Sequence, residues 1–293
     1  MNNTALKSIK YIAIALVATM HYSCIKEVDN LNLPNTKPKL VVQSFISPGD
    51  SITATVYASK PINYNVGSNS YYSAYDTVKN ATITLINLST GSSTTIPFDA
   101  DKKKYILPPL DFSIEKGTEY ELNVTANTFE PITARTTVPT GEATAKLNKI
   151  DTVNVEEYGG VRIWISGTID DPATEKNFYK ISSYITDTDT LETRVVSFFW
   201  TFYSDSNQNG ETINFNHPMY YHENGTTEII QSYITILFYE IDEHYYKFHK
   251  SIETIYGTMD NPFTESSHLY SNIEGGLGVF ASFVQVEEIN TEK

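Results

Sequence analysis

Short runs of alternating apolar and polar residues recur along the chain, and they predict β-strands. Val41-Val-Gln-Ser-Phe-Ile46 and Ile52-Thr-Ala-Thr-Val-Tyr57 are two such runs, rich in β-branched and aromatic residues. The turn-forming residues Ser47-Pro-Gly-Asp50 lie between them, so this pair predicts a hairpin. Within residues 39–138 the predicted strands are Lys39–Ser47, Ile52–Ser59, Ala81–Leu88, Lys104–Leu107, Glu119–Thr125 and Pro131–Val138.

The number and spacing of these strands predict a mostly β protein that begins with an immunoglobulin-like β-sandwich over residues 39–138. Val138-Pro-Thr-Gly-Glu142 is typical of a domain boundary, because an X-Pro step is extended and glycine follows it. We expect a second β-rich domain over residues 143–293. Its predicted strands are Ile150–Val155, Val161–Ile169, Phe178–Ile185, Thr193–Tyr203, Thr212–Phe215, Ile229–Tyr239 and Gly278–Glu288.

One amphipathic helix is predicted near residues 242–256. Asp242 is a good N-cap, and Gly257 is placed where a C-capping glycine is common. The helix prediction rests on apolar residues spaced four, three, four and three apart, namely Ile241, Tyr245, Phe248, Ile252 and Ile255.

The N-terminus indicates export and lipid attachment. Residues 1–23 combine two lysines with an uncharged run of ten residues, which is too short to span a bilayer and is typical of a signal peptide. Ser23 followed by Cys24 resembles the cleavage site of a bacterial lipoprotein, although His21 stands where an aliphatic residue is usual. The alternative is an ordinary signal peptide that ends near a cysteine. Residues 24–38 are polar and contain two prolines, so they predict a tether.

Composition narrows the classes of partner. The formal net charge is −14, and removal of residues 1–23 with their two lysines makes it −16. Such a charge argues against nucleic acid and anionic lipid headgroups as partners. Cys24 is the single cysteine, so the chain forms no internal disulfide and its core must provide its stability.

A long segment between two predicted strands is the strongest binding candidate in the sequence. Residues 60–80 combine Gly, Ser and Asn with four tyrosines, and tyrosine on an adaptable polar loop is typical of a recognition surface. The alternative is a long loop whose tyrosines pack back on the sandwich. The candidate residues are Tyr64, Tyr71, Tyr72 and Tyr75.

The evidence for a metal site is weaker. Asp205, Asn207 and Asn209, followed by Gly210, match the first half of a calcium loop, but Asn216 stands where a bidentate glutamate is required. The alternative is a hairpin with a polar tip. The histidines lack the paired spacing of a zinc site, so we expect them at the surface or at an interface. We predict no cofactor.

A repeated pattern suggests covalent modification. Four Asp-[Ser/Thr]-aliphatic sequences resemble the O-glycosylation signal of exported proteins of the Bacteroidota, although an aspartate before Thr-Val is also how a turn enters a strand. The hydroxyl residues of these sequences are Ser51, Thr77, Thr152 and Thr190.

Catalysis is not expected. The chain has no Gly-x-Ser-x-Gly sequence, and Ser113-Ile-Glu-Lys116 precedes a glycine in a β context rather than starting a helix. The stretch Ser271-Asn-Ile-Glu-Gly-Gly-Leu-Gly278 could form an anion-binding loop, but a strand-like sequence follows where such loops require a helix. We therefore interpret it as a bend before the last strand.

Five segments along the chain carry a family resemblance, namely Lys39–Ser47, Asp171–Lys180, Glu243–Phe248, Asn261-Pro-Phe-Thr-Glu265 and Tyr270–Phe280. Together they resemble the domain-of-unknown-function 4249 family of Bacteroidota lipoproteins. Members of this family are often encoded near TonB-dependent transporters. The resemblance therefore implies an accessory or binding subunit of an uptake system. Such a subunit would pair with an outer-membrane β-barrel and face the cell exterior. The alternative is a stand-alone glycan- or peptide-binding, or adhesin-like, surface lipoprotein.

Overall fold

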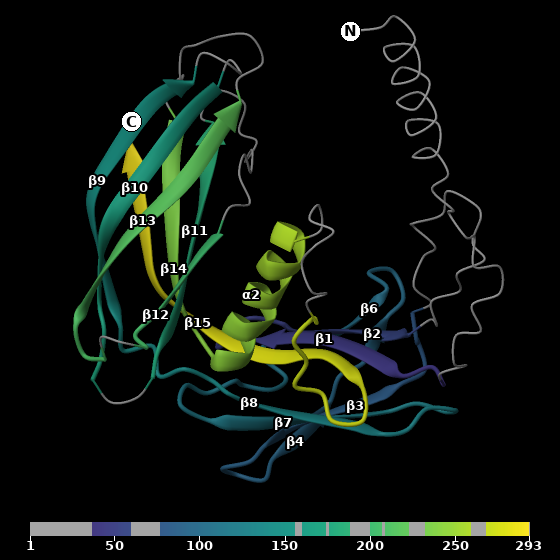
Figure 1. The fold of residues 1–293 in the computed structure, drawn as a ribbon. Helices are drawn as coiled ribbons and strands as arrows, with labels where there is room; N and C mark the ends of the chain where they lie inside the picture. The colour runs from purple at the N-terminus through teal and green to yellow at the C-terminus, as the bar shows by residue number, and fades with distance from the viewer. Residues whose placement is uncertain are drawn as a thin grey trace, which may run out of the picture. The chain divides into compact units, whose positions relative to one another are not determined.

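The computed structural model describes residues 37–59, 77–155, 160–173, 176–187, 200–206, 209–222, 232–258 and 268–292. This part of the chain is mostly β, as predicted, and its strands form sheets in a sandwich-like arrangement (Figure 1). The helix α2 (Glu243–Thr258) is the one helix in these residues. No helix within them has the length and apolar character needed to cross a membrane.

The described strands belong to three sheets. Across the largest sheet the order is β12 (Trp200–Ser204), β11 (Phe178–Asp187), β14 (Ser232–Ile241), β15 (Leu277–Glu292), β1 (Leu40–Ile46), β2 (Ile52–Ala58), β6 (Lys104–Leu107) and β5 (Phe98–Asp99). The second sheet contains β4 (Ser93–Thr95), β3 (Thr82–Asn87), β7 (Glu119–Thr125) and β8 (Ile132–Thr137). The third sheet contains β13 (Thr212–His222), β10 (Gly160–Asp170) and β9 (Thr144–Val155).

Strand β15 joins the two halves of the largest sheet. Its first residues, 277–282, pair in parallel with β1, and residues 283–292 pair antiparallel with β14 (Figure 1). Because β1 precedes the predicted boundary at residues 138–142 and β14 follows it, this single strand connects both segments of the chain through backbone hydrogen bonds.

Alternating burial along the strands produces two cores between facing sheets. The pattern in β1 alternates between buried and more exposed positions, so one face of the strand is covered. One core lies between β1, β2 and β6 and the second sheet, and includes Val42, Val56 and Leu122. The other lies between β11, β14 and the third sheet, and includes Ile165 and Ile236.

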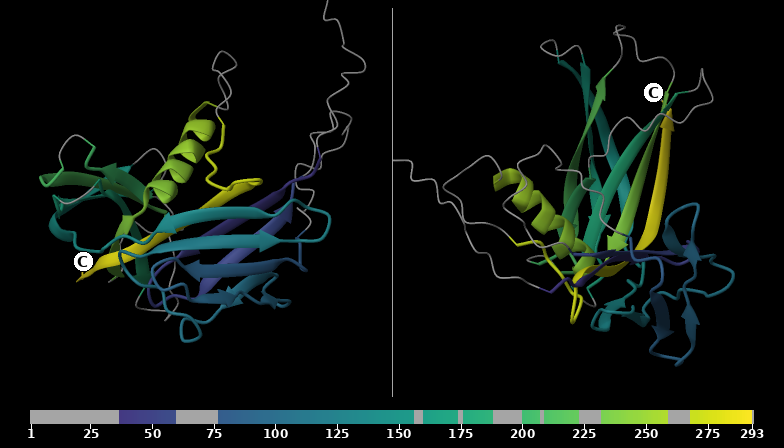
Figure 2. Two further views of the ribbon diagram at one scale, coloured as in Figure 1. Left: turned by 90° about the horizontal axis from the view of Figure 1, so that it is seen from below. Right: turned by 90° about the vertical axis from the view of Figure 1, so that its right-hand side faces the viewer.

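Helix α2 covers the outer face of the largest sheet. Figure 2 shows the helix on one side of β1 and β15 and the second sheet on their other side. A third apolar cluster fills the contact, with Phe178 from β11, Val279 from β15, and Tyr245 and Phe248 from the helix. The Asp242 carboxylate accepts a 2.7 Å hydrogen bond from the backbone N–H of Tyr245, so Asp242 is the N-cap that the sequence predicts.

Most strand predictions within the described residues are confirmed, including the hairpin of β1 and β2. The predicted C-cap is wrong, because α2 continues through Gly257 and ends at Thr258. Strand β13 is longer than expected and contains Pro218, which an edge strand tolerates. Residues 113–116 form no helix, and β15 follows the glycine-rich stretch, as the sequence analysis expected. The immunoglobulin-like topology remains a prediction.

Candidate functional site

A lysine lies on the sheet face that α2 covers. Lys180 is in β11, where its neighbours across the ladders are Phe202 of β12 and Tyr239 of β14. Facing residues of paired strands place their side chains on the same side of a sheet. Tyr245 and His249 approach from the helix one turn apart, because residues four apart share a helical face. We call Lys180, Trp200, Phe202, Tyr239, Tyr245 and His249 the aromatic site.

The Lys180 ammonium lies among three aromatic rings. Its Nζ atom is 5.0 Å from the ring centre of Tyr239, 5.3 Å from that of Tyr245 and 5.9 Å from that of Trp200. These distances fall within the range of cation–π attraction. The ammonium also donates a 2.9 Å hydrogen bond to the Tyr245 hydroxyl. The rings therefore replace part of the hydration that burial removes from the charge.

The ammonium has no acidic partner among the described residues. The described ion pairs involve other lysines and Arg135, and burial is the cause that lowers the pKa of Lys180 to about 8. A nearby carboxylate would raise this pKa instead. Lys180 consequently remains mainly charged at neutral pH, without an opposite charge from the described part of the chain.

His249 adds a second polar group to the site. Its ring stacks on Phe202 at 5.4 Å and lies 4.6 Å from the Tyr245 ring. Burial, followed by the positive charge of Lys180, lowers the pKa of His249 to about 4, so the imidazole is neutral at physiological pH. Its Nε2 atom is buried and has no hydrogen-bond partner among the described residues. An orphaned buried nitrogen is costly unless a ligand or water satisfies it.

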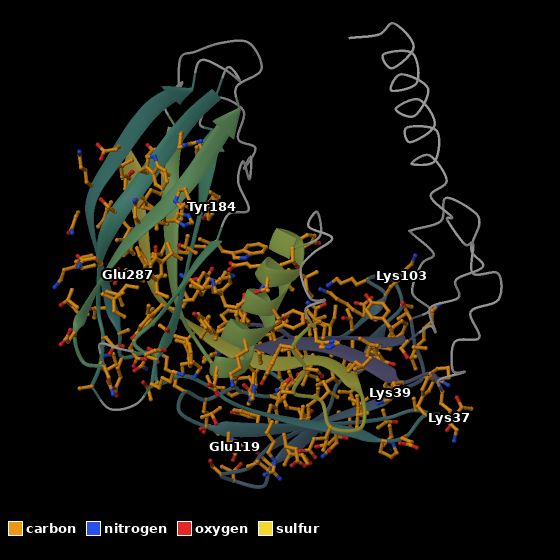
Figure 3. All side chains as sticks on the ribbon, viewed as in Figure 1. Lys37, Lys39, Lys103, Glu119, Tyr184 and Glu287 are labelled. Atoms are coloured by element: carbon orange, nitrogen blue, oxygen red, sulfur yellow. The ribbon has the colours of Figure 1, made fainter. Side chains whose placement is uncertain are left out.

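The aromatic site is open at one side. Trp200 is 39% exposed, although it lies edge-on to the His249 ring at 5.8 Å. Tyr184, which Figure 3 labels, is half-buried. It follows Lys180 by four residues in β11, so both side chains lie on the same face of the strand. The exposed Trp200 can therefore present a flat ring beside the Lys180 cation to a molecule that approaches from solvent, whereas the Nε2 atom of His249 lies buried behind it.

A second polar cluster surrounds the start of α2. Asp242 is buried and accepts hydrogen bonds from the Thr136 hydroxyl of β8 and from the Tyr245 amide. The Asp242 amide donates to the Ser282 carbonyl of β15 at 3.0 Å. Burial raises the pKa of Asp242 to about 7, against the lowering effect of these hydrogen bonds. Asp242 thus connects two strands to the helix, β8 through its carboxyl group and β15 through its backbone amide.

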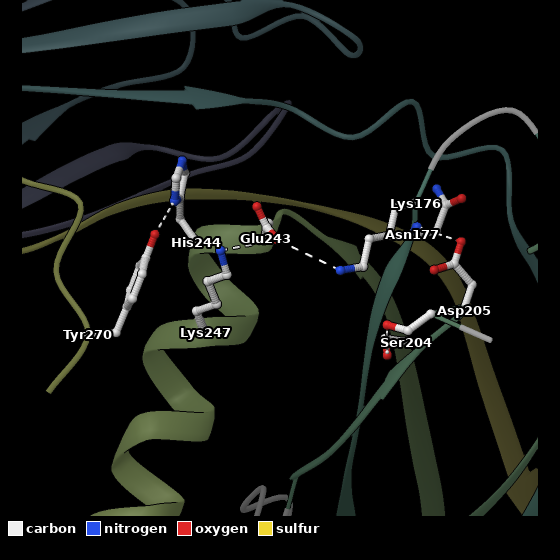
Figure 4. Close-up of polar contacts among 9 residues, drawn as sticks. Lys176, Asn177, Ser204, Asp205, Glu243, His244, Lys247 and Tyr270 are labelled. Carbon is white, nitrogen blue, oxygen red and sulfur yellow. Dashed lines mark hydrogen bonds and ion pairs between the residues drawn. The ribbon is translucent and has the colours of Figure 1, made fainter. Parts of the chain in front are cut away.

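The charged residues around this helix start are paired with one another (Figure 4). Glu243 lies 3.2 Å from Lys247 and 3.8 Å from Lys176, and His244 shares a 2.7 Å hydrogen bond with the Tyr270 hydroxyl. A hollow of about 380 Å³ lies beside them, lined in part by Glu240 and by the connection between β8 and β9. Because its polar groups already bind parts of the chain, we assign this cluster a structural role.

The weak calcium candidate has a similar structural environment. Asp205 is buried at the end of β12 and accepts a 2.9 Å hydrogen bond from the Asn177 amide (Figure 4). Asn209 is exposed, and Asn207 lies outside the described residues. No group of three or more His, Cys, Asp or Glu side chains within the described residues is arranged to hold a metal ion.

One histidine prediction is wrong. His217 is fully buried in β13 instead of lying at a surface or interface. Its ring nitrogens lie 2.9 Å from the Ser183 hydroxyl and 3.0 Å from the Thr201 hydroxyl. Burial lowers the pKa of His217 to about 4, so the neutral ring joins three strands inside the core.

The structure places few of the other predicted site residues. Ser51 is exposed before β2, Thr152 is exposed on β9, and Thr77 is half-buried in a bridge to Tyr57. The predicted residues that lie outside the described part of the chain are Ser23, Cys24, Tyr64, Tyr71, Tyr72, Tyr75 and Thr190.

Sequence reasoning missed the aromatic site because its residues come from four separate elements. The available signal was local: Lys180 interrupts an aromatic and aliphatic strand, and Trp200 and Phe202 alternate in the next one. Alternation places each set on a sheet face, but it does not say which strands are neighbours.

A comparison with family models places the chain in a family. The model described as Domain of unknown function (DUF4249) matches residues 26–289, which is most of the chain. A comparison with curated proteins finds no match.

Proposed function

Because the chain belongs to the DUF4249 family, we propose that it is a lipid-anchored, non-catalytic binding subunit of a TonB-dependent uptake system. In this proposal Cys24 carries the lipid at the outer membrane, and the folded chain faces the cell exterior. A large outer-membrane β-barrel is its partner. The charged and apolar pattern of residues 1–23 and the polar tether that follows support this arrangement.

The aromatic site is the observation that carries the binding role. Ligand sites commonly combine aromatic walls with a few polar groups that fix orientation. Here a partly exposed Trp200 borders an ammonium and a neutral imidazole, both with hydrogen-bonding capacity that the described residues leave unused. A stably packed core would more often contain neither group. The site therefore favours recognition of a molecule from solution.

Capture from solubilised outer membranes tests this proposal. The full chain, tagged after Lys293, is isolated in mild detergent, and the co-isolated proteins are identified by mass spectrometry. We expect one large β-barrel at a fixed ratio to the tagged chain. The matched control is the Cys24→Ser variant, which should be absent from the outer-membrane fraction and should not co-isolate the β-barrel. Repeated isolation of the anchored chain alone would refute the subunit role.

The second candidate is a stand-alone glycan- or peptide-binding lipoprotein. It is favoured by the aromatic site itself, where the exposed Trp200 beside the Lys180 ammonium can contact a ligand directly. In that case the isolated full chain would bind its ligand with undiminished affinity in the absence of any β-barrel, and deletion of the barrel would leave ligand capture by cells unchanged.

A further inference from the structure

We propose that the aromatic site binds one carboxylate carried on a ring with an apolar face, as in a uronic acid residue of an acidic glycan. Lys180 is the ionic partner of that carboxylate, and Trp200 provides the exposed stacking surface. This inference rests on the proposed binding function and assigns a ligand class to the same site.

The first argument is the missing opposite charge. A buried ammonium is normally paired, because removal of a charge from water is expensive. Lys180 has three N–H donors, and the described residues use one of them, for the Tyr245 hydroxyl. Lys176, four residues earlier, also lies near an aromatic ring, at 4.9 Å from Phe178, but it is paired with Glu243. Lys180 thus differs from its neighbour by the lack of an anion, which a ligand can supply.

The second argument is the orphaned nitrogen of His249. Its Nε2 atom is buried without a described partner, and the imidazole lies close enough to Lys180 for the charge of Lys180 to lower its pKa. A neutral imidazole can donate one hydrogen bond from Nε2 in the appropriate tautomer. A carboxylate has two acceptor oxygens, so it can satisfy the ammonium and the imidazole together.

The surroundings select among anions and ring systems. A phosphate site usually uses backbone N–H groups at a helix start, whereas His249 and Tyr245 approach from within α2. The Lys180 ammonium repels cations, and its single charge is balanced by one carboxylate at the site. These conditions leave a single carboxylate as the anion that the site accepts. The rings of Trp200 and Tyr239 favour a ligand with a flat, partly apolar face.

Titration of the purified full-length protein in detergent tests this inference. The probes are trigalacturonate, the matching neutral galactose trisaccharide, and benzoate, and the readouts are calorimetry and tryptophan fluorescence. We expect trigalacturonate to bind and the neutral trisaccharide to bind at least about 10-fold more weakly, since a charge-assisted hydrogen bond contributes about 10- to 100-fold. If benzoate binds and trigalacturonate does not, the result would support recognition of a carboxylate and would identify the ligand as an aromatic acid instead of a uronic acid.

Two lysine variants make the test specific. Lys180→Met should weaken carboxylate binding by about 10- to 100-fold while the protein stays folded, because methionine retains the apolar stem. Lys176→Met is the matched control and should bind like the unmodified protein. A third variant, Trp200→Leu, should weaken binding and leave the preference for the charged over the neutral trisaccharide intact.

Several results would overturn the inference. They are equal binding of charged and neutral trisaccharides, no binding of either carboxylate probe, and Lys180→Met with unchanged affinity in a folded protein. Failure here is distinguishable from failure of the proposed function, because co-isolation of the β-barrel does not depend on this ligand. If the β-barrel co-isolates with the chain but no carboxylate binds, the subunit role is supported and the proposed ligand class is refuted.

Discussion

Replacement of Gly278 with alanine tests the joint between the two halves of the largest sheet. Gly278 pairs with Val42 where β15 meets β1, and its φ angle is +113°. A Cβ atom there would lie 2.8 Å from the carbonyl carbon of Val42 and 2.9 Å from its amide nitrogen, and closer still to the carbonyl oxygen. The obstacle is backbone, so a side-chain movement cannot relieve it.

The expected destabilisation follows from two contributions. A side chain in this backbone region costs about 1–3 kcal/mol. Separation of β15 from β1 to relieve the contact would weaken two or so ladder hydrogen bonds, each contributing about 0.5–1.5 kcal/mol. We therefore expect Gly278→Ala to lower the free energy of unfolding by about 2–6 kcal/mol. That is a large part of the total stability of a typical domain.

The assay is urea unfolding followed by circular dichroism, with Gly257→Ala as the matched control. Gly257 is exposed within α2, and a Cβ atom there would meet nothing within 4 Å. Gly257 is the last residue but one of α2, and alanine is favoured over glycine in a helix by up to about 1 kcal/mol, so the control should unfold at a slightly higher urea concentration. The two glycine variants thus have opposite expected signs. A loss below about 1 kcal/mol in Gly278→Ala would refute the described pairing of β1 with β15.

The remaining predictions concern pH and modification. The raised pKa of Asp242, about 7 against an ordinary value near 4, favours the folded state at low pH, and about 4 kcal/mol of this stability is lost as pH rises from 4 to 7. Asp242→Asn should remove that loss. If the urea midpoint of the variant depended on pH as steeply as that of the unmodified protein, this prediction would be contradicted. The pKa of His217, lowered to about 4, acts in the opposite direction, because the folded state favours the neutral imidazole. The resulting stability is fully present above pH 6.5, and about 3 kcal/mol of it is lost as the pH falls to 4. His217→Gln should remove this second loss, so the two variants should change the pH slope with opposite signs. For glycosylation of the four Asp-[Ser/Thr]-aliphatic sequences, we expect glycopeptides in a digest of protein from its native membrane, and only unmodified peptides would count against it.

Local patterns were sufficient to predict the strands and the helix. Alternation identified β1, β2 and β7, and helical spacing identified α2, since these periods report directly which face is buried. The N-cap Asp242 was also predictable, because capping depends on residues next to it in the chain. Gly257 shows the limit of such rules: the sequence position suited a C-cap, but the helix continues one residue further.

The pairing of distant segments could not be predicted in this way. Val41 and Leu277 are paired although more than 200 residues separate them, and no local period encodes that choice. The aromatic site follows from the same pairing, because Lys180 meets Tyr239 only where β11 and β14 are neighbours. His217 is a similar case, since its burial depends on hydroxyls from β11 and β12.

The intact mass of the protein isolated from its native membrane tests most directly whether this chain works from a lipid anchor. The account predicts a chain that starts at Cys24 and is heavier than residues 24–293 by a diacylglyceryl group and an amide-linked acyl chain, with the mass of any O-linked glycan in addition. Mild alkali should then remove the ester-linked acyl chains and lower the mass accordingly. An unmodified chain that starts at another residue, or the unprocessed 293-residue polypeptide, would contradict the account.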